Sequence, residues 1–196
     1  MTAASRSLGD EESPTAPSAA QARIIAAALD LFARHGVGDH LQGGPADEIG
    51  VTKAAVYHQY NAKDEIVLAA AEAELARLHR VISAAETAGS PTRVRDALID
   101  GIVDLAVTRR RTVGALLGDP VLGALFVEHE SFRDVMARLH RILIGGDTGP
   151  EGRVRLAMLV AALSGAVIHA FVVDLDDDTL RPQLRRLARR FLGLPR

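Results

Sequence analysis

Residues 46–60 read Ala46-Asp47-Glu48-Ile49-Gly50-Val51-Thr52-Lys53-Ala54-Ala55-Val56-Tyr57-His58-Gln59-Tyr60. This run predicts two short helical pieces with Gly50 in the turn between them, because glycine adopts turn conformations that other residues avoid. Thr52 can cap the second piece, which places Lys53 in its first turn. A helix, a tight turn and a second helix in this order indicate a helix-turn-helix, which inserts the start of its second helix into the major groove of DNA.

Helices flank this motif on both sides. From residue 18 to about residue 35, Ile25, Leu29 and Phe32 recur at helical spacing, and Gly36 follows where a left-handed cap would end a helix. On the other side, Asn61-Ala62-Lys63-Asp64-Glu65-Ile66 begins the next helix. The motif therefore belongs to a small helical unit rather than to an isolated hairpin.

Residues 21–70 resemble the amino-terminal DNA-binding domain of the TetR family of bacterial transcriptional repressors, and beyond them only the number and length of the helices agree. The resemblance implies a two-domain, all-helical homodimer in which the helix-turn-helix reads a palindromic operator. It also implies a carboxy-terminal domain that binds a small effector and dimerises through its last two long helices. By matching position, it implies that DNA is contacted by Thr52, Lys53, Tyr57, His58, Tyr60 and Lys63.

The chemistry of these positions suits DNA. The hydroxyl of Thr52 can reach a phosphate, and Lys63 stands at a helix amino terminus, which attracts phosphate by itself. The chain has only two lysines, Lys53 and Lys63, and both fall where DNA would lie. The alternative interpretation is that Thr52 is only a cap, the two tyrosines are partly core, and the lysines are solvated surface.

Residues 41–45, Leu41-Gln42-Gly43-Gly44-Pro45, depart from the family pattern, which has Thr or Ser at the first place and a core aliphatic at the last. Inside a helix, glycine costs about 1 kcal/mol and proline about 3 kcal/mol. We therefore expect the first helix of the motif to be shortened or displaced and the affinity for DNA to be reduced. This departure supports a second hypothesis, a helical ligand-binding or interaction protein whose degraded helix-turn-helix no longer binds DNA.

The composition is that of a globular protein. Of 196 residues, 48% are hydrophobic and 24% are charged, which is enough for a sizeable core. The absence of cysteine excludes a disulfide scaffold, a thiolate zinc site and a cysteine nucleophile. With 23 basic and 25 acidic residues the net charge is −2, so any DNA binding must be local. Residues 1–17 contain no apolar stretch for a signal peptide, and we expect a cytoplasmic protein.

Helical periodicity continues beyond the motif, and no segment alternates as a half-buried strand would. We expect an all-α fold of about nine helices in three parts: a disordered tail at 1–17, the helix-turn-helix domain at 18–63, and an effector-binding and dimerisation domain at 64–196. In the last part we expect a helix from Lys63 to about Ala88 and a second one from Pro91, with Val94, Leu98, Ile102 and Leu105 buried. A short helical piece follows Arg111, and a helix, whole or kinked, follows from Leu122 to Ile144. The last two helices are expected from about residue 151 to Val173 and from Asp178 or Thr179, the latter with Leu180, Leu184, Leu187 and Phe191 buried.

One segment required a test as a membrane span, because Leu156 to Val173 is eighteen residues without a formal charge. About half of it is Ala, Gly, Ser or His, which is less apolar than a bilayer demands. We therefore predict a buried helix in a bundle core or at a subunit interface, where small residues allow close approach. No membrane partner is expected.

Two groups of histidines and aspartates could suggest catalysis or metal binding. His129 and His140 are eleven residues apart on one predicted helix, about 16 Å at the helical rise, too far to share a metal ion. The run Asp174, Asp176 and Asp178 lacks the glycine and the glutamate of a calcium loop and is typical of helix-capping acids. We predict no enzyme, no cofactor and no metal site, and a solvated face for the arginines of the last helix.

The sequence as a whole favours a ligand-responsive repressor that is released from DNA by a small, mostly apolar effector. The residues proposed to line the effector pocket are Leu78, Ile82, Leu105, Leu117, Phe126, His129, Met136, His140 and Met158. The two histidines would supply hydrogen bonds there, although each can equally be a satisfied surface histidine.

Overall fold

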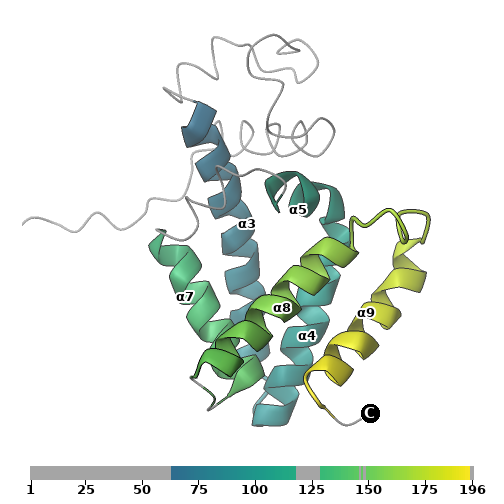
Figure 1. Ribbon diagram of the computed structural model, residues 1–196. Coiled ribbons are helices and arrows are strands. Elements are labelled where there is room, and N and C mark those ends of the chain that lie inside the picture. Colours follow the sequence, from purple (N-terminus) through teal and green to yellow (C-terminus); the bar gives the residue numbers. More distant parts are fainter. Residues whose placement is uncertain (1–62, 118–128, 146, 148, 195–196) are drawn as a thin grey trace, which may run out of the picture.

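The computed structural model describes residues 63–117, 129–145, 147 and 149–194, and these residues are helical without a strand (Figure 1). The elements are α3 (Lys63–Glu86), α4 (Pro91–Thr108), α5 (Arg110–Leu117), α7 (Glu130–Leu139), the π-helix η2 (His140–Ile144), α8 (Pro150–Ala166) and α9 (Asp177–Phe191). The predicted all-α class is confirmed. The tail at 1–17 and the helices expected in 18–62 lie outside the described residues, so the count of nine stays a prediction.

A tight turn joins α3 to α4, as the sequence predicts. Gly89 has a φ of +90°, a left-handed conformation that favours glycine. The side chain of Ser90 accepts a hydrogen bond from the backbone N–H of Arg93 at 3.4 Å, and Pro91 opens α4. This turn sets the two helices antiparallel, with α3 descending and α4 rising in Figure 1.

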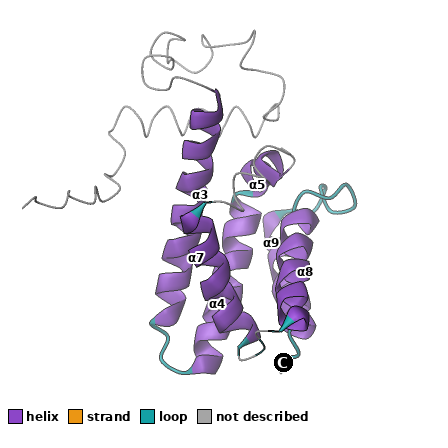
Figure 2. Ribbon diagram, turned by 60° about the vertical axis from the view of Figure 1, so that its left-hand side comes forward, coloured by secondary structure: helices purple, strands orange, loops and turns teal. Residues whose placement is uncertain are grey.

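The helix α4 lies at the centre of the bundle. It contacts α3, α5, α8, α9 and η2, and Figure 2 shows it between α3 and the pair α8 and α9. Because neighbours cover more than one side of it, its buried face is wider than the predicted stripe. Only Leu98 of that stripe is fully buried, whereas Val94, Ile102 and Leu105 are half-buried. The remaining buried positions are Ile99, Val103, Ala106 and Val107.

The predicted helix from Leu122 to Ile144 is described from residue 129 onward. Here α7 runs directly into η2, so a change of helix type takes the place of the expected kink. Val135, Leu139 and Leu143, four residues apart, are buried along both pieces. Gly145, with a φ of +77°, ends η2 and donates its N–H to the carbonyl of His140 at 3.2 Å.

The predicted end of α8 was wrong. The helix ends at Ala166 rather than near Val173, and residues 167–176 follow it as turns and loop. Glycine at 165 and the β-branched pair Val167 and Ile168 have low helix propensity, which accounts for the earlier end. In the single chain only Gly152, Leu156, Leu159 and Leu163 of this helix are buried, so its predicted place in a bundle core or at a subunit interface stays a prediction. No helix in the described ranges is long and apolar enough to cross a membrane.

The last helix, α9, starts one residue before the predicted region, at Asp177. Asp176 caps it and accepts a hydrogen bond from the backbone N–H of Thr179 at 2.7 Å, which lowers the pKa of the Asp176 carboxyl. The interpretation of these acids as caps is thus confirmed for Asp176. Leu180 and Leu184 are buried as predicted, but Ala188 completes the buried stripe, while Leu187 and Phe191 are exposed.

Arginines of α9 pair with aspartates of α4 along their antiparallel contact. Arg189 Nη1 lies 3.0 Å from Asp96 Oδ1, Arg185 Nη2 lies 2.8 Å from Asp104 Oδ1, and Arg181 Nε lies 2.8 Å from the same oxygen. Arg185 Nε also faces Asp100 Oδ1 at 3.3 Å. We call this set the α4–α9 charge ladder. The prediction of a merely solvated arginine face was therefore wrong for Arg185 and Arg189, because acids spaced four residues apart on α4 stand opposite them.

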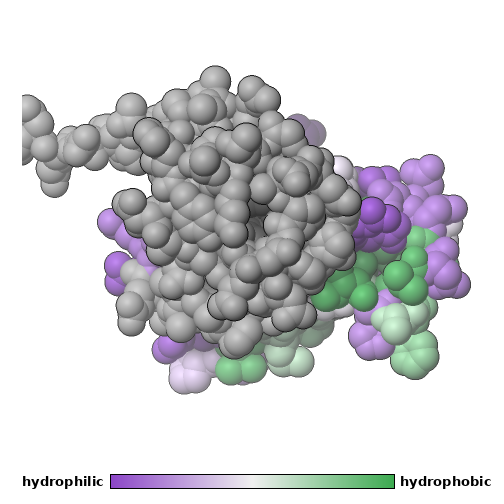
Figure 3. All heavy atoms as spheres, turned by 90° about the horizontal axis from the view of Figure 1, so that it is seen from above, coloured by the Kyte–Doolittle hydropathy of each residue, from purple (hydrophilic) through white to green (hydrophobic). Residues whose placement is uncertain are grey.

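The exposed large apolar side chains of the described residues all belong to α8, α9 and their connection. They are Val154, Met158, Ile168, Phe171, Val173, Leu187 and Phe191, and Phe171 is 88% exposed. Figure 3 shows hydrophobic surface beside hydrophilic surface on the side of the molecule where these elements lie. We call these seven residues the α8–α9 apolar surface. Within the described residues, the other large apolar side chains are buried or half-buried, and this surface is the exposed apolar face.

Candidate functional site

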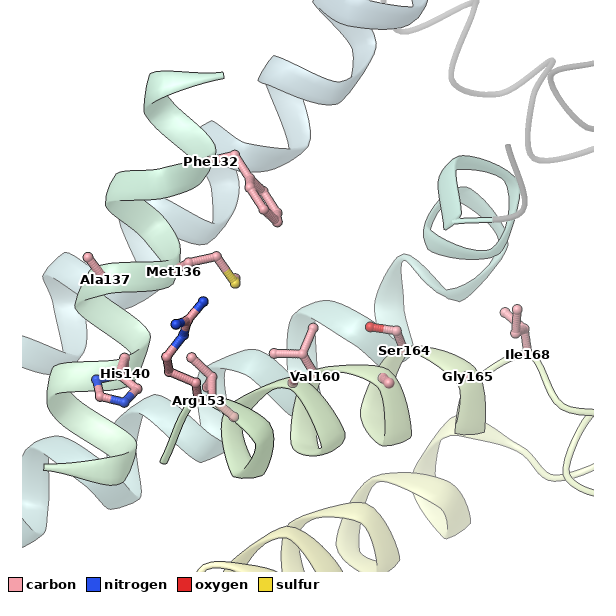
Figure 4. Close-up of a pocket in the computed structure, with 12 residues that line it drawn as sticks. Phe132, Met136, Ala137, His140, Arg153, Val160, Ser164, Gly165 and Ile168 are labelled. Atoms are coloured by element: carbon pink, nitrogen blue, oxygen red, sulfur yellow. The ribbon is translucent and has the colours of Figure 1, made fainter. Parts of the chain in front are cut away.

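A groove of about 800 Å³ lies between α7 and α8 (Figure 4). This volume is in the range of roughly 300–1,000 Å³ that small-molecule sites occupy. Phe132 and Met136 of α7 form one wall, and Leu156 and Val160 of α8 form the other. The π-helix η2 ends at Ile144 and α8 begins at Pro150, and α7 and α8 diverge from there (Figures 1 and 4). We call the end of the groove beside these residues its narrow end and the opposite end its open end.

Two polar side chains, His140 and Arg153, line the narrow end. The guanidinium of Arg153 forms no hydrogen bond or ion pair with the described residues, whereas Arg155 on the same helix is 3.1 Å from Glu151. The Nε2 atom of His140 is shielded from solvent and has no hydrogen-bond partner within the described part of the chain. Polar groups without partners at one end of an apolar groove are the features that orient a bound small molecule.

A smaller cavity of about 140 Å³ lies behind the groove. Leu78 of α3 and Ile102 and Leu105 of α4 line it, and Ser164, Met136 and Val160 belong to the linings of both spaces. The groove therefore adjoins the interior of the bundle, and the half-buried Ile102 and Leu105 of α4 face this inner space.

The residues proposed from sequence to line the pocket fall into three groups. Leu78, Leu105, Met136 and His140 line the groove or the inner cavity. Three others lie elsewhere: Ile82 is fully buried in the core, Met158 is 55% exposed on the outer side of α8, and His129 Nε2 is 3.0 Å from Glu72 Oε1 of α3. Phe126 and the side chain of Leu117 lie outside the described residues.

Sequence reasoning missed Phe132, Arg153, Val160 and Ser164 of the lining. Two signals in the sequence point to part of this set. Phe132, Met136 and His140 are spaced four residues apart, which puts them on one helix face. Arg153, Val160 and Ser164 likewise share one face of the next helix. Which faces oppose each other depends on the packing of α7 against α8, and the sequence does not specify that packing.

Polar contacts join α7 and η2 to α3 on the side away from the groove. Arg138 donates to Ser83 Oγ at 3.0 Å and to Glu86 Oε2 at 2.8 Å, and Arg141 donates to Glu86 Oε1 at 3.1 Å. The Arg138 hydrogen bond, above all, lowers the pKa of the Glu86 carboxyl. His79 Nδ1 also lies 3.0 Å from Arg138 Nη1. The wall of the groove is thus tied to the helix that begins at Lys63.

The proposed DNA contacts at Thr52, Lys53, Tyr57, His58 and Tyr60 lie outside the described residues. Lys63 is the first described residue of α3, and because the residues before it are outside the described part of the chain, the predicted helix start stays a prediction. Its assignment as a phosphate contact remains a prediction. No group of three or more histidine, aspartate or glutamate side chains in the described ranges could hold a metal ion.

Comparison with known proteins gives a family and a fold. Residues 24–70 match the bacterial regulatory proteins of the tetR family. A regulatory protein of the tetR family from Rhodococcus RHA1 is 20% identical, with a TM-score of 0.68 over 92% of this chain and 100% of that chain. A TetR-like transcriptional regulator from Rhodococcus sp. RHA1 is 21% identical, with a TM-score of 0.66 over 91% of this chain and 98% of that chain.

A more distant structure has the same fold. It is a transcriptional regulator of the TerR/AcrR family from Aquifex aeolicus VF5, 16% identical, with a TM-score of 0.63 over 87% of this chain and 98% of that chain. No curated protein matches the chain.

The sequence match is therefore to the helix-turn-helix segment of the tetR regulators at residues 24–70, and the described residues after it are all-helical. Over the rest of the chain the likeness to these solved structures is one of fold.

Proposed function

We propose that this chain is a DNA-binding transcriptional repressor that acts as a homodimer on a palindromic operator and leaves it when a small, mostly apolar effector binds. The observation that carries the proposal is the order of parts along the chain. A matched segment containing the helix-turn-helix pattern leads, at Lys63, into a helical domain with an apolar groove. In this proposal residues 18–63 bind DNA and residues 64–196 bind the effector and dimerise.

The contacts of α7 suggest how the effector site communicates with DNA. The groove uses one side of α7, and the other side is joined to α3 through the Arg138 and Arg141 contacts with Glu86 and through His129 with Glu72. A ligand that shifts α7 therefore also shifts α3. Because α3 begins at Lys63, such a shift changes the spacing of the two recognition helices in a dimer. Repression requires this spacing to match the operator.

The homodimer is supported by the α8–α9 apolar surface. Its seven residues cover the last two helices and their connection, and the small residue Ala162 lies open on α8 beside Met158. A second copy of α8 and α9 can pack closely here and would bury Leu187 and Phe191 in a four-helix contact. That explains why these two residues, predicted to be buried, are exposed in a single chain.

The test is a fluorescence anisotropy titration of full-length protein with DNA from upstream of its own gene, repeated over a series of salt concentrations. We expect a palindromic site with half-sites about 34 Å apart, one helical turn. Lys63→Ala should weaken binding to all sequences and reduce the salt slope by about 1, because a phosphate contact carries no base information. Arg80→Ala removes an exposed charge farther along α3 and is the matched control. It should change neither the affinity for DNA nor the salt slope.

Other outcomes separate the remaining possibilities. If Lys53→Ala gives the same slope change as Lys63→Ala with unchanged base preference, Lys53 touches only phosphate. If the wild type binds no DNA at low salt, the helix-turn-helix is degraded, as residues 41–45 suggest. The chain would then be a helical ligand-binding or interaction protein.

A further inference from the structure

We propose that the groove between α7 and α8 binds an amphipathic carboxylate, with the carboxylate on Arg153 and the apolar body along the two helices. This inference rests on the proposed function, since it names the chemical class of the effector. It also makes a statement about binding that can be tested without DNA.

The groove has a polar and an apolar end. Along α7 and η2 the lining runs from Phe132 through Met136 to His140. Along α8 it runs from Arg153 past Val160 to Ile168, which follows the helix. Because η2 leads into α8 through the turn at 145–149, both polar residues lie at the same, narrow end (Figure 4). A ligand with a polar head and an apolar tail can therefore bind with its head at the narrow end and its tail toward the open end.

The charge at the narrow end is the exposed guanidinium of Arg153, which is available to pair with an anion. Arg153 has no ion pair in the described part of the chain, although nearby arginines do, Arg141 with Glu86 and Arg155 with Glu151. A guanidinium pairs best with a planar carboxylate through two parallel hydrogen bonds. A phosphate monoester carries nearly two charges and three strong acceptor oxygens, which one arginine in an otherwise apolar groove does not satisfy.

The size of the groove limits the apolar body. From His140 to Phe132 the α7 wall is eight residues long, about 12 Å at the rise of an α-helix. The volume of about 800 Å³ admits an alkyl chain of medium length or an aryl-alkyl group. Met136, Val160 and Ser164 separate this space from the inner cavity, so the tail stays in the groove unless these side chains move.

Isothermal titration of the full-length protein with decanoate and with decanol, both below their aggregation limits, tests the inference. We expect decanoate to bind at least about tenfold more tightly, because a hydrogen bond to a charged group contributes about 1.5–3 kcal/mol and 1.4 kcal/mol is tenfold. Arg153→Ala should remove that advantage and leave decanol binding unchanged. Arg155→Ala, the matched loss of a charge on the same helix, should leave both affinities unchanged.

A second variant checks the position of the tail. Ala157 lines the groove and is exposed, so Ala157→Phe should fill the groove without disturbing the core and abolish binding of both compounds. Circular dichroism verifies that the variant is folded. Equal affinity of the wild type for decanoate and decanol, or an unchanged decanoate affinity in Arg153→Ala, would overturn the inference.

The DNA titration distinguishes failure of this inference from failure of the proposed function. If decanoate binds as expected but does not release DNA, the carboxylate site stands and its role as effector site is wrong. If the protein binds its operator but no decanoate, the regulator stands and the carboxylate site is wrong.

Discussion

At the scale of single residues, Gly152 holds the narrow end of the groove together. It is buried in the first turn of α8, and a Cβ atom there would collide with the backbone oxygen of Asp147 and lie 2.9 Å from its Cγ. A backbone oxygen cannot swing aside as the end of a long side chain can. Close packing at this one position therefore fixes the turn that brings Arg153 next to the end of η2.

We predict that Gly152→Ala destabilises the protein. The helix itself favours alanine over glycine by about 1 kcal/mol, but overpacking costs about 1–3 kcal/mol, so the free energy of unfolding should fall by roughly 1 kcal/mol. Urea denaturation measures this change. Glu151→Ala, at the exposed neighbouring position, should stay within about 0.5 kcal/mol of the wild type. An unchanged denaturation midpoint in Gly152→Ala would show that the turn moves freely.

At the scale of elements, paired charges determine how the helices are fastened to one another. The α4–α9 charge ladder holds the last helix on the central one, and the contacts of Glu86 with Arg138 and Arg141 hold α7 and η2 on α3. These pairs are partly exposed, so each is weak and sensitive to salt. Their contribution to stability can be measured helix by helix.

For the ladder, we predict that Arg185→Ala costs about 1 kcal/mol of unfolding free energy relative to Arg186→Ala. Arg185 lies near two aspartates of α4, whereas Arg186 contacts only Gln183 of its own helix. Exposed ion pairs contribute about 0.2–1 kcal/mol each, and Arg185 takes part in two. Thermal denaturation at low and high salt measures the effect, and the difference should shrink as salt screens the charges. A difference that is independent of salt would mean that the loss comes from packing.

For α7, we predict a dependence of stability on acid pH. The Arg138 hydrogen bond lowers the pKa of the Glu86 carboxyl from its ordinary value of 4.5. When the pKa of a carboxyl is lower in the folded state than in the unfolded state, its full stabilising effect is present at pH values above the unfolded-state pKa. This stabilisation is lost as the pH falls through the folded-state pKa. The free energy of unfolding of the wild type should therefore be larger than that of Glu86→Gln near neutral pH. This difference should disappear as the pH falls below 4.5.

Urea denaturation over a pH series provides the measurement for both proteins. Glu130→Gln is the control, because Glu130 forms no ion pair with the described residues. A gap between wild type and Glu86→Gln that persists in acid would contradict the assignment.

The elements also show what sequence can predict. The turn at Gly89, Ser90 and Pro91 follows from local chemistry, and the structure confirms it. The early end of α8, the rotated stripe of α4 and the position of Arg153 depend on which helices become neighbours. Apolar periodicity indicates that a face is covered but not by what. For that reason the sequence predicted the class of fold, whereas the residues that line the groove between α7 and α8 depend on a packing that the sequence does not specify.

At the scale of the whole molecule, the described domain has two distinct surfaces on α8. One side faces the groove, where Arg153 and Val160 lie, and the outer side carries Met158 beside the open Ala162. In the proposed dimer the outer side meets a second copy while the groove faces α7. Binding of effector and binding of the partner subunit would then use adjoining faces of one helix, so a movement of α8 affects both.

We predict that Ala162→Arg converts the protein to a monomer, because it places an unpaired charge in the centre of an apolar contact, where burial without a partner is strongly unfavourable. Light scattering at micromolar concentration should give half the mass of the wild type. Thr92→Arg adds the same charge at an exposed position on α4, away from this surface, and should leave the dimer intact. The monomer should bind a palindrome no better than a single half-site, since it carries one recognition helix. A wild type that is itself monomeric at this concentration would leave the α8–α9 apolar surface without its proposed partner.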